Sequence, residues 1–415
     1  MVSVAHVIKT VMGAAEPMGT ERVTLPNALG RVLAENVTGP RDIPPKDNSA
    51  MDGYAVIAAD TAGAAQDKPA TLQIIEEIPA GMAATKTVTQ GTATRIMTGA
   101  LIPNGADAVV PVEDTDSSST HVAIFRAAEP GANVRFRGED VRQGHVIVPA
   151  GTVLKPACLG MLASLGRAVI PVFQRPTVAL ISTGNELVDI DETPDDTSII
   201  TSNSYSLAGQ ITENGGIPLV IGIARDDKKD ILSLFRQALR ADIVVSSAGI
   251  SEGNYDFVAD VLEELGVTVH FTRVAERPGK PMVFGTKEQQ LFFSLPGNPV
   301  SSMMTFEQYV RPAILKMSGH RRVFRRTVHA VMGEDFEKKK GLRYFLRGIL
   351  KEDGTGYTVI TTGGQGSGIL TSMVQANAVI VLPEEKTHIA RGDRVTAQIL
   401  DPSFGATEEP RFLVP

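Results

Sequence analysis

The sequence has little of the chemistry that sulfur and indole side chains provide. It contains one cysteine, Cys158, and no tryptophan, and 5% of its 415 residues are aromatic. A single cysteine excludes an intramolecular disulfide and is typical of a reducing compartment. Its apolar neighbours favour a small core side chain over a nucleophile. The seven histidines are scattered singly, without a second ligand at the spacing of a zinc site.

Charge and hydropathy exclude two further classes of partner. The formal net charge is −7, and no lysine-rich block or basic tail is present, which argues against nucleic acid. No run of about eighteen apolar residues occurs, and the N-terminus lacks the pattern of a signal peptide. These absences predict a soluble, cytoplasmic protein with no membrane partner.

The chain is long enough for several domains. Apolar residues from Val4 to Met12 recur at helical spacing, and roughly residues 20–150 are β-rich. From about Pro176 to Met317, apolar strands alternate with amphipathic helices, which predicts a doubly wound parallel α/β domain. The basic segment Arg321–Arg326, which we interpret as a solvated linker, precedes a second β-rich region.

The stretch Asp47–Tyr54 is unusually polar for a core segment. Pro44 and Pro45 precede it and force an extended entry. Such a loop either caps a backbone N–H through Asp52 or presents that carboxylate to a ligand. The local pattern by itself favours the capped turn.

Four segments that follow predicted strands of the α/β domain are rich in hydroxyl, glycine and carboxylate groups. They are Ser182–Glu186, Asp226–Asp227, Ser246–Gly253 with Asp256, and Leu295–Ser301. Ligands of open α/β sheets bind outside the carboxyl ends of the strands. Hydroxyls and backbone N–H groups can hold an anion, and carboxylates among them suit a hydrated Mg²⁺. Each segment alone could be a cap and turn, but four of them predict a binding site.

A fifth segment, Arg273–Pro281, carries three cations and two prolines. It is either a solvated loop or a site for phosphate or another oxyanion, to be held by Arg273, Arg277 and Lys280. No dinucleotide-binding GxGxxG and no GxxxxGK[ST] loop is present, which disfavours a Rossmann dehydrogenase and a P-loop NTPase.

Further short motifs, each different from the others, are distributed along the whole chain. They are Ala28–Ala34, Asn48–Val56, Arg95–Ala100, Gly105–Val110, Arg137–Asp140, Lys340–Arg343 with Arg347, and Gln365–Ser367. Together with the loops above, and in this order, they resemble the molybdopterin molybdenumtransferase family, which includes the bacterial MoeA proteins and the E domain of gephyrin. The resemblance covers essentially the whole chain.

The resemblance implies a multidomain α/β protein with β-rich N-terminal domains, a central molybdopterin-binding α/β domain and a C-terminal β barrel-like domain. The implied divisions are an elongated domain of residues 1–20, 43–52 and 141–174, an inserted β domain of 21–42 and 53–140, the α/β domain of 175–324, and a C-terminal domain of 325–415. It also implies a homodimer whose active site combines the α/β domain of one subunit with the N-terminal domains of the other.

The implied reaction inserts molybdate into adenylylated molybdopterin, with Mg²⁺-dependent release of AMP. By family analogy the catalytic residues would be Asp52, Thr98, Asp140, Glu186, Asp226 and Asp256, of which the last three would bind Mg²⁺. Substrate would be bound by Thr183, Gly184, Ser247, Gly249, Ser251, Arg273, Arg277, Lys280, Ser294, Pro296, Gly297, Asn298, Pro299, Arg343 and Ser367. A molybdopterin adenylyltransferase and molybdoenzyme acceptors would be further partners, and the choice between molybdate and tungstate stays open.

The sequence departs from the common family pattern in a few places. Arg273 and Arg277 stand where lysines are usual, Ala248 replaces a glycine, Asn185 an acidic residue and Lys46 an aromatic one.

Two other functions compete with the leading one. The α/β domain alone resembles a molybdopterin adenylyltransferase, and the relative gephyrin also acts as a non-catalytic scaffold. The additional domains argue against the adenylyltransferase.

Overall fold

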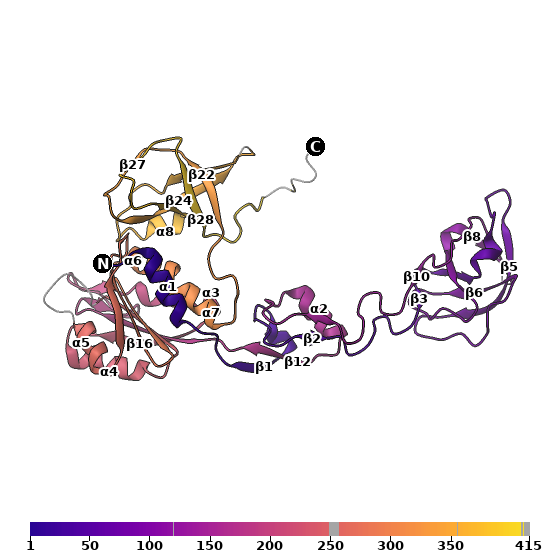
Figure 1. The fold of residues 1–415 in the computed structure, drawn as a ribbon, viewed down its shortest axis with the longest axis horizontal. Helices are drawn as coiled ribbons and strands as arrows, with labels where there is room; N and C mark the ends of the chain where they lie inside the picture. Colours follow the sequence, from indigo (N-terminus) through magenta and orange to yellow (C-terminus); the bar gives the residue numbers. More distant parts are fainter. Residues whose placement is uncertain (119, 249–256, 355, 408–409, 411–415) are drawn as a thin grey trace. The chain divides into compact units, whose positions relative to one another are not determined.

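A computed structural model describes residues 1–118, 120–248, 257–354, 356–407 and 410. The chain forms two compact units, shown with their helices and strands in Figure 1. The first unit comprises residues 1–34, 151–156 and 169–415, and the second comprises residues 35–150 and 157–168. None of the helices in the described ranges reaches the length and apolarity that crossing a bilayer requires.

The first unit is built around a six-stranded sheet in the order β16-β13-β17-β21-β20-β18. Its strands are β13 (Thr177–Thr183), β16 (Ile217–Ala224), β17 (Ile243–Ser247), β18 (Thr268–Arg273), β20 (Pro281–Lys287) and β21 (Gln290–Leu295). The strands β16, β13, β17 and β21 run parallel, whereas β20 runs antiparallel to both of its neighbours. The predicted parallel α/β sheet is confirmed, and β20 is an addition to it.

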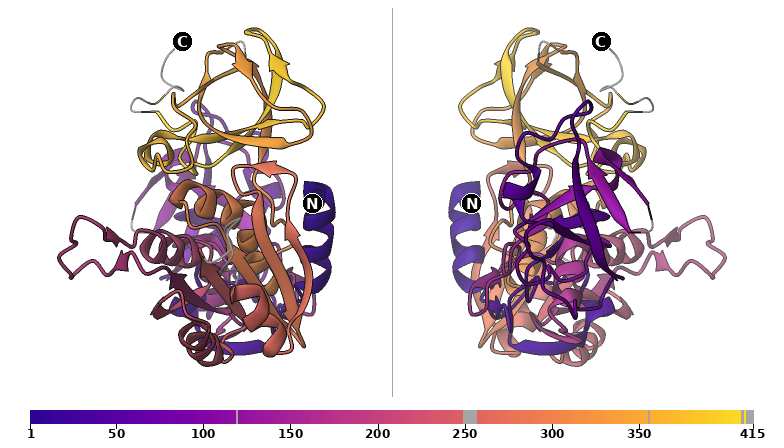
Figure 2. Two further views of the ribbon diagram at one scale, coloured as in Figure 1. Left: turned by 90° about the vertical axis from the view of Figure 1, so that its left-hand side faces the viewer. Right: turned by 90° about the vertical axis from the view of Figure 1, so that its right-hand side faces the viewer.

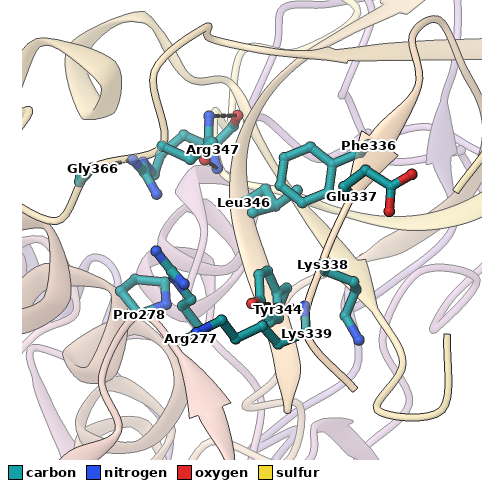
Figure 3. A pocket seen from close by; sticks show the side chains of 11 residues that line it. Arg277, Pro278, Phe336, Glu337, Lys338, Lys339, Tyr344, Leu346, Arg347 and Gly366 are labelled. Carbon is teal, nitrogen blue, oxygen red and sulfur yellow. Dashed lines mark hydrogen bonds between the residues drawn. The ribbon is translucent and has the colours of Figure 1, made fainter. Parts of the chain in front are cut away.

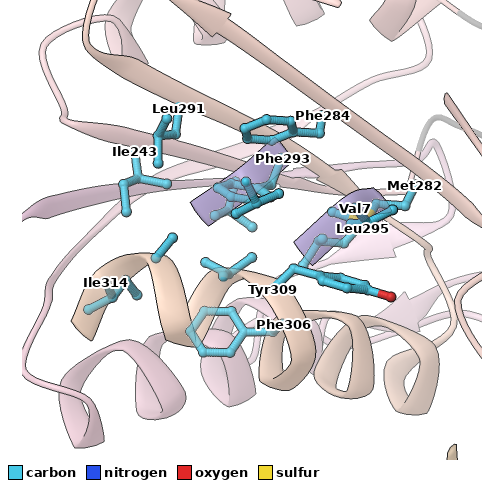
Figure 4. Packing of buried hydrophobic residues seen from close by; sticks show 14 of the residues in the cluster. Val7, Ile243, Met282, Phe284, Leu291, Phe293, Leu295, Phe306, Tyr309 and Ile314 are labelled. Carbon is cyan, nitrogen blue, oxygen red and sulfur yellow. The ribbon is translucent and has the colours of Figure 1, made fainter. Parts of the chain in front are cut away.

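Helices cover both faces of this sheet. One face packs against α1 (Val4–Ala14), α3 (Asn203–Glu213), α6 (Pro299–Thr305), η4 (Phe306–Val310) and α7 (Arg311–Met317), and the other against α4 (Lys228–Ala238) and α5 (Phe257–Glu264). Figure 4 shows the first of these cores, in which Phe284 and Phe293 of the sheet lie opposite Phe306 and Ile314 of the helices. Each large side chain fully removed from water contributes about 1.5–3 kcal/mol to the stability of the fold. Because helices cover both faces of the sheet, the predicted doubly wound arrangement is also confirmed.

The helical segment after β21 changes pitch in its middle. Its first and last parts, α6 and α7, are α-helical, but η4 between them is a π-helix whose five residues are all buried. A π-helix holds an extra residue per turn and rotates the side chains that follow. Three polar side chains, Glu307, Gln308 and Tyr309, consequently face the protein interior.

The basic segment Arg321–Arg326 is less exposed than predicted. The Nε of Arg325 lies 2.8 Å from the Oε1 of Glu307, which also accepts a 2.7 Å hydrogen bond from the Nε of Arg311. Glu307 and Arg311 are buried, and two guanidinium groups compensate for the cost of burying the carboxylate. The interpretation as a solvated linker was wrong for Arg325, while Arg321 and Arg322 are exposed.

The C-terminal region is a closed barrel, as predicted. Its strands are β22 (Thr327–Met332), β24 (Arg343–Glu352), β25 (Tyr357–Thr361), β26 (Ala378–Leu382) and β28 (Arg394–Ile399). The barrel closes because the ten-residue β24 pairs with β26 through its first half and with β25 through its second half. The short strand β19 (Glu276–Arg277) adds to the beginning of β24 and joins the α/β domain to the barrel. Figure 2 shows the barrel, in orange and yellow, above the α/β sheet.

The second unit contains another six-stranded sheet, in the order β7-β4-β6-β5-β9-β8. Its strands are β4 (Gly53–Val56), β5 (Ala70–Ile78), β6 (Thr92–Ile96), β7 (Ala108–Pro111), β8 (Thr115–Ser117) and β9 (His121–Ile124). Position 53 in β4 requires glycine, because a Cβ atom there would lie 2.0 Å from the backbone oxygen of Val110 on β7. Asp52 directly precedes this close approach.

Shorter elements complete the fold. They are β1 (Thr20–Thr24), η1 (Leu25–Ala28), β2 (Val37–Thr38), β3 (Asn48–Ser49), η2 (Ala58–Thr61), η3 (Val112–Asp114), β10 (Val134–Arg135), β11 (Val146–Val148), α2 (Pro156–Ser164), β12 (Val169–Phe173), β14 (Leu187–Val188), β15 (Ile199–Ile200), β23 (Phe336–Glu337), α8 (Thr371–Gln375) and β27 (His388–Ile389).

Candidate functional site

The loops after β13 and β16 meet at the carboxyl edge of the α/β sheet. The backbone nitrogen of Asn185 donates to Oδ2 of Asp226 over 3.2 Å, and the nitrogen of Asp226 donates to Oδ1 of Asn185 over 3.1 Å. The next residue, Asp227, accepts a hydrogen bond from the nitrogen of Asp230 and caps α4. The capping role therefore belongs to Asp227, and Asp226 joins the two loops.

The carboxylate of Glu186 lies over Gly184 in the same loop. A Cβ atom on Gly184 would come within 2.6 Å of the Oε2 atom of Glu186, and Gly184 has φ +151°. A larger residue at this position would displace the carboxylate. Glu186 and Asp226 are both exposed, so these two of the three predicted metal ligands are accessible to a ligand.

Buried hydroxyl groups gather where β13 and β17 end. The Oγ of Ser182 lies 2.9 Å from the Oγ of Ser204 and 3.2 Å from the Oγ of Ser247. Thr183, next in β13, is also buried, with its Oγ1 3.4 Å from the carbonyl oxygen of Ser247. Two of the predicted substrate-binding residues, Thr183 and Ser247, are thus brought together by adjacent parallel strands.

The fourth strand-end loop follows β21. Ser294 and Pro296 are buried, Pro299 is half-buried, and Gly297 and Asn298 are exposed. The side-chain nitrogen of Asn203 donates to the carbonyl oxygen of Gly297 over 2.8 Å and so fixes this loop against α3.

The loop after β17 begins with Ala248, whose φ is +75°. A left-handed backbone is the conformation that glycine adopts most easily, which explains why the substitution of glycine by alanine constrains this loop. A Cβ atom added at Gly297 would lie 3.0 Å from the Cβ of Ala248. Three predicted site residues further along this loop, Gly249, Ser251 and Asp256, lie outside the described residues.

The basic segment Arg273–Pro281 is not simply a solvated loop. Val274 and Glu276 are buried, while Arg273, Arg277 and Lys280 are exposed. The guanidinium of Arg277 lies over the ring of Tyr344, 5.7 Å from its centroid. A cation at that distance is attracted by the face of the ring, which holds Arg277 at the boundary between the sheet and the barrel.

Arg277 lines a pocket of about 510 Å³ between the α/β domain and the barrel (Figure 3). The other lining residues are Pro278, Phe336, Glu337, Lys338, Lys339, Tyr344, Leu346, Arg347, Gln365 and Gly366. Four of the eleven carry a positive charge and one a negative charge, so the pocket favours an anion.

Arg347 lines the pocket but is not among the site residues predicted from the sequence. Its side chain is fully buried on β24, its Nε donates to Ser372 and its Nη2 to the carbonyl of Gly366, each over 3.0 Å. Its Nη1 has no hydrogen-bond partner within the part of the chain that the structure describes. Burial lowers the pKa of Arg347 to about 10, which leaves the guanidinium charged at neutral pH. Figure 3 shows Arg347 in the upper part of the view and Arg277 in the lower part, both among the side chains that line the pocket.

The two other predicted residues of the C-terminal region are engaged differently. Arg343 forms an ion pair with Glu384, with its Nη2 2.8 Å from Oε2. Ser367 accepts a hydrogen bond from the nitrogen of Val300 through its backbone carbonyl. Neither side chain is among those that line the pocket.

In the second unit, Asp52 and Thr98 are in direct contact. The backbone nitrogen and the Oγ1 of Thr98 both donate to Oδ1 of Asp52 over 2.7 Å. These two hydrogen bonds lower the pKa of Asp52. Asp140 is exposed, and its backbone nitrogen donates to the carbonyl of Ile43 over 3.1 Å.

Comparison with known proteins covers nearly the whole chain. Residues 2–166 match the MoeA N-terminal region (domain I and II), residues 179–316 the probable molybdopterin binding domain, and residues 329–400 the MoeA C-terminal region (domain IV).

Named relatives and a solved structure agree with these matches. Molybdopterin molybdenumtransferase 2 of Mycobacterium tuberculosis is 38% identical over 396 residues, which cover 94% of this chain and 96% of the relative. The molybdopterin molybdenumtransferase of Nostoc is 37% identical over 382 residues, 91% of this chain and 88% of the relative. The crystal structure of the molybdopterin biosynthesis moeA protein of Pyrococcus horikoshii is similar with a TM-score of 0.82 at 32% identity, covering 96% of this chain and 100% of that one. The chain therefore belongs to the molybdopterin molybdenumtransferase family.

Proposed function

We propose that this protein inserts molybdate into adenylylated molybdopterin, releasing AMP and molybdenum cofactor. The family supplies the reaction, and one observation in the structure supports it most directly. The buried guanidinium of Arg347 has an Nη1 without a partner among the described residues, in a pocket that Arg277 also lines. A buried, charged donor without an acceptor is costly unless a ligand provides one.

The pocket is suited to an oxyanion. Molybdate is a tetrahedral dianion, and its oxygens can accept from the Nη1 of Arg347 while Arg277 contributes a second positive charge. Lys280, and Arg273 at the end of β18, belong to the same segment as Arg277 and are retained as further candidates for oxyanion binding. Tungstate has nearly the same size and charge, so both oxyanions are candidate substrates.

The strand-end loops would hold the adenylylated pterin. Hydroxyl groups and backbone N–H groups at the carboxyl ends of parallel strands bind phosphate, and buried hydroxyls are present at the ends of β13 and β17. We assign pterin and phosphate binding to Thr183, Gly184, Ser247, Gly249, Ser251, Ser294, Pro296, Gly297, Asn298 and Pro299. Arg343 and Ser367 would contribute to substrate binding from the C-terminal region. The guanidinium of Arg343 is held there by its ion pair with Glu384.

Mg²⁺ fits this site as a hydrated ion shared with the substrate phosphates. The described residues contain no group of three or more His, Cys, Asp or Glu side chains that could hold a metal by themselves. Mg²⁺ in nucleotide sites needs only one or two carboxylates, which Glu186 and Asp226 would supply, and Asp256 is a third candidate. When bound, the ion polarises the bridging phosphoryl group. The protein positions these carboxylates by the contact of Glu186 with Gly184 and by the hydrogen bonds between Asn185 and Asp226.

The family resemblance also supports a homodimer in the cytoplasm, in which Asp52, Thr98 and Asp140 complete the active site of the partner subunit. We retain the four-domain division given above as part of this proposal. Molybdopterin adenylyltransferase, as the source of the adenylylated substrate, and molybdoenzymes that accept the product are the expected partners.

Purified protein incubated with adenylylated molybdopterin, Mg²⁺ and molybdate tests the proposal. We expect AMP and a cofactor that activates a molybdoenzyme lacking it. Formation of adenylylated molybdopterin from molybdopterin and ATP would instead support the adenylyltransferase. If the protein showed neither activity, the scaffold function would be the one supported. A matched incubation without molybdate shows whether AMP release is coupled to insertion.

A further inference from the structure

We propose that Glu276 is a positioning residue of the oxyanion site, and that its neutral carboxyl group holds the segment Arg277–Lys280 in place. This inference rests on the proposed function, because it concerns the residues assigned to bind the oxyanion. Glu276 precedes Arg277 on β19, the strand that joins the α/β domain to the barrel. Its side chain touches neither the pocket nor the solvent, so it acts through its neighbours.

Glu276 occupies a place where a charged side chain is unexpected. It is 1% exposed, and its residue pairs with Arg343 across β19 and β24 through the backbone. The side chain of Arg343 turns instead to Glu384. An ionised carboxylate that is buried without a cation is strongly destabilised, so burial favours the protonated form.

The partner of Glu276 is supplied by the π-helix. The hydroxyl of Tyr309, in η4, donates a short hydrogen bond to Oε2 of Glu276. An α-helical path through residues 306–310 would turn the side chain at position 309 by a different angle, because the π-helix has an extra residue per turn. The change of pitch described above therefore has a specific result: it directs a phenol at the carboxyl group beside Arg277.

The second oxygen of Glu276 lies away from Tyr309. Because the hydroxyl of Tyr309 contacts only Oε2, Oε1 is the oxygen that can carry the carboxyl proton while Oε2 accepts from the phenol. Oε1 and the Oγ1 of Thr305 are both buried without a partner among the described residues. A Cβ atom on Gly279 would lie 2.6 Å from that Oε1 and 2.5 Å from that Oγ1. Both oxygens therefore lie against Gly279, which explains the absence of a side chain there.

The charges around this pair do not neutralise an ionised Glu276. Burial raises the pKa of Glu276 to about 8, and the hydrogen bond from Tyr309 lowers it by a smaller amount. Tyr309 also faces Arg343 and Glu384, whose charges oppose each other. Arg277 is held over Tyr344 at the edge of the pocket, as is the ammonium of Lys338, 5.0 Å from the ring centroid.

The consequence is a dependence of oxyanion affinity on the charge of Glu276. When this carboxyl is neutral, it does not compete with the oxyanion for Arg277, which lines the pocket. When it ionises, a negative charge adjacent to Arg277 attracts that cation and repels the bound anion. Molybdate remains a dianion from pH 7 to pH 9, so a change in its affinity over this range originates in the protein.

The test is calorimetric titration of the full-length protein with molybdate at pH 7 and pH 9. We compare the wild type with Glu276→Gln, which is nearly isosteric and always neutral, and with Glu263→Gln, an exposed control on α5. We expect the affinity of the wild type and of Glu263→Gln to fall by about three- to tenfold at pH 9, as a like charge nearby predicts. Glu276→Gln should keep most of its affinity.

The outcomes are distinct. An equal loss of affinity in Glu276→Gln and the wild type would overturn this inference and leave the proposed function intact. Failure of the wild type to bind molybdate at either pH would overturn both. Tyr309→Phe is a second, independent variant: it removes the donor that stabilises the ionised carboxylate, so the loss of affinity should move to higher pH. An unchanged midpoint in that variant would contradict the assigned role of Tyr309 and of Glu276 with it.

Discussion

Asp52 and Thr98 are 46 residues apart in the sequence, and both donors of Thr98 reach the same oxygen of Asp52. The loop Asp47–Tyr54 could be a capped turn or a ligand-binding loop on local pattern alone. In the structure Asp52 does accept a backbone N–H, but from a residue on a distant loop that the family pattern also assigns to the active site. A carboxylate held in this way is kept ionised and oriented.

Thr98→Val tests this relationship. The variant keeps the backbone hydrogen bond and removes the hydroxyl, which is the larger cause of the lowered pKa of Asp52. We therefore expect the pKa of Asp52 to rise toward its ordinary value, measured by carbon NMR of the labelled carboxyl group. If Asp52 must be ionised for turnover, the acidic limb of the rate profile should move to higher pH with it. Thr115→Val, on the same sheet, is a control whose hydroxyl donates to the carbonyl of Val112.

The variant Arg347→Met should change the affinity for molybdate and the free energy of unfolding in different ways. Because Arg347 is buried and no carboxylate pairs with it in the described chain, we expect the unfolding free energy to stay equal or to rise by about 1–4 kcal/mol. Molybdate affinity should fall by at least about tenfold, the effect of one charge-assisted hydrogen bond. Chemical denaturation and calorimetry measure the two quantities. Arg394→Met, at an exposed site on β28, should change neither, and full binding by Arg347→Met would refute the assigned oxyanion site.

The stability of the protein should depend on pH through Glu276. Its pKa is about 8 in the folded protein and near 4.5 when unfolded, so between these values only the folded state holds the proton. The unfolding free energy contributed by this group is therefore complete below pH 4.5, decreases by about 1.4 kcal/mol per pH unit up to pH 8, and is constant beyond. Subtracting the profile of Glu276→Gln from that of the wild type isolates this slope. Parallel profiles would show that Glu276 is ionised in the folded state.

Ala248→Gly should stabilise the protein by about 1 kcal/mol, because the alanine has φ +75° and glycine adopts this conformation without steric cost. Thermal or chemical denaturation measures the change. The same replacement at Ala208, inside helix α3, should have the opposite sign and a similar size. A loss of stability in Ala248→Gly would mean that contacts of its Cβ outweigh the backbone strain.

Glu186→Ala should abolish turnover while leaving the fold intact, because the carboxylate is exposed and lies at a strand end. Molybdate affinity should be retained, since the proposed oxyanion pocket is lined by other residues. Asp191→Ala, an exposed carboxylate five positions further along, is the control. Normal AMP release by Glu186→Ala would remove this residue from the catalytic set.

Regular patterns predicted most of the fold. Apolar strands alternating with amphipathic helices predicted the α/β domain, in which β13 and β17 are largely apolar runs. The longest barrel strand, β24, escaped prediction because Arg347 and Gly348 interrupt its apolar run. Burial of an arginine violates the pattern of a core strand, and the violation marks a proposed binding residue. The sequence could not reveal the partners of Arg347, since Ser372 and Gly366 come from elsewhere in the barrel.

The π-helix and the antiparallel β20 were also not predicted. Periodicity distinguishes an α-helix from a strand, but one inserted residue in a buried helix leaves no clear mark on an apolar pattern. The role of Glu276 depends on that inserted residue. In the segment Arg273–Pro281, the sequence identified the cations, whereas the structure shows that Val274, Glu276, Pro278 and Gly279 between them are buried.

The pairing of β19 with β24 has a kinetic consequence. Arg277 and Arg347 lie on two strands of one hydrogen-bonded sheet, so their separation is fixed during folding. Oxyanion capture should therefore require no rearrangement of the backbone, and its rate should rise linearly with molybdate concentration. The two guanidinium groups lose their conformational entropy when the chain folds. No further entropy is lost in bringing them together in each catalytic cycle.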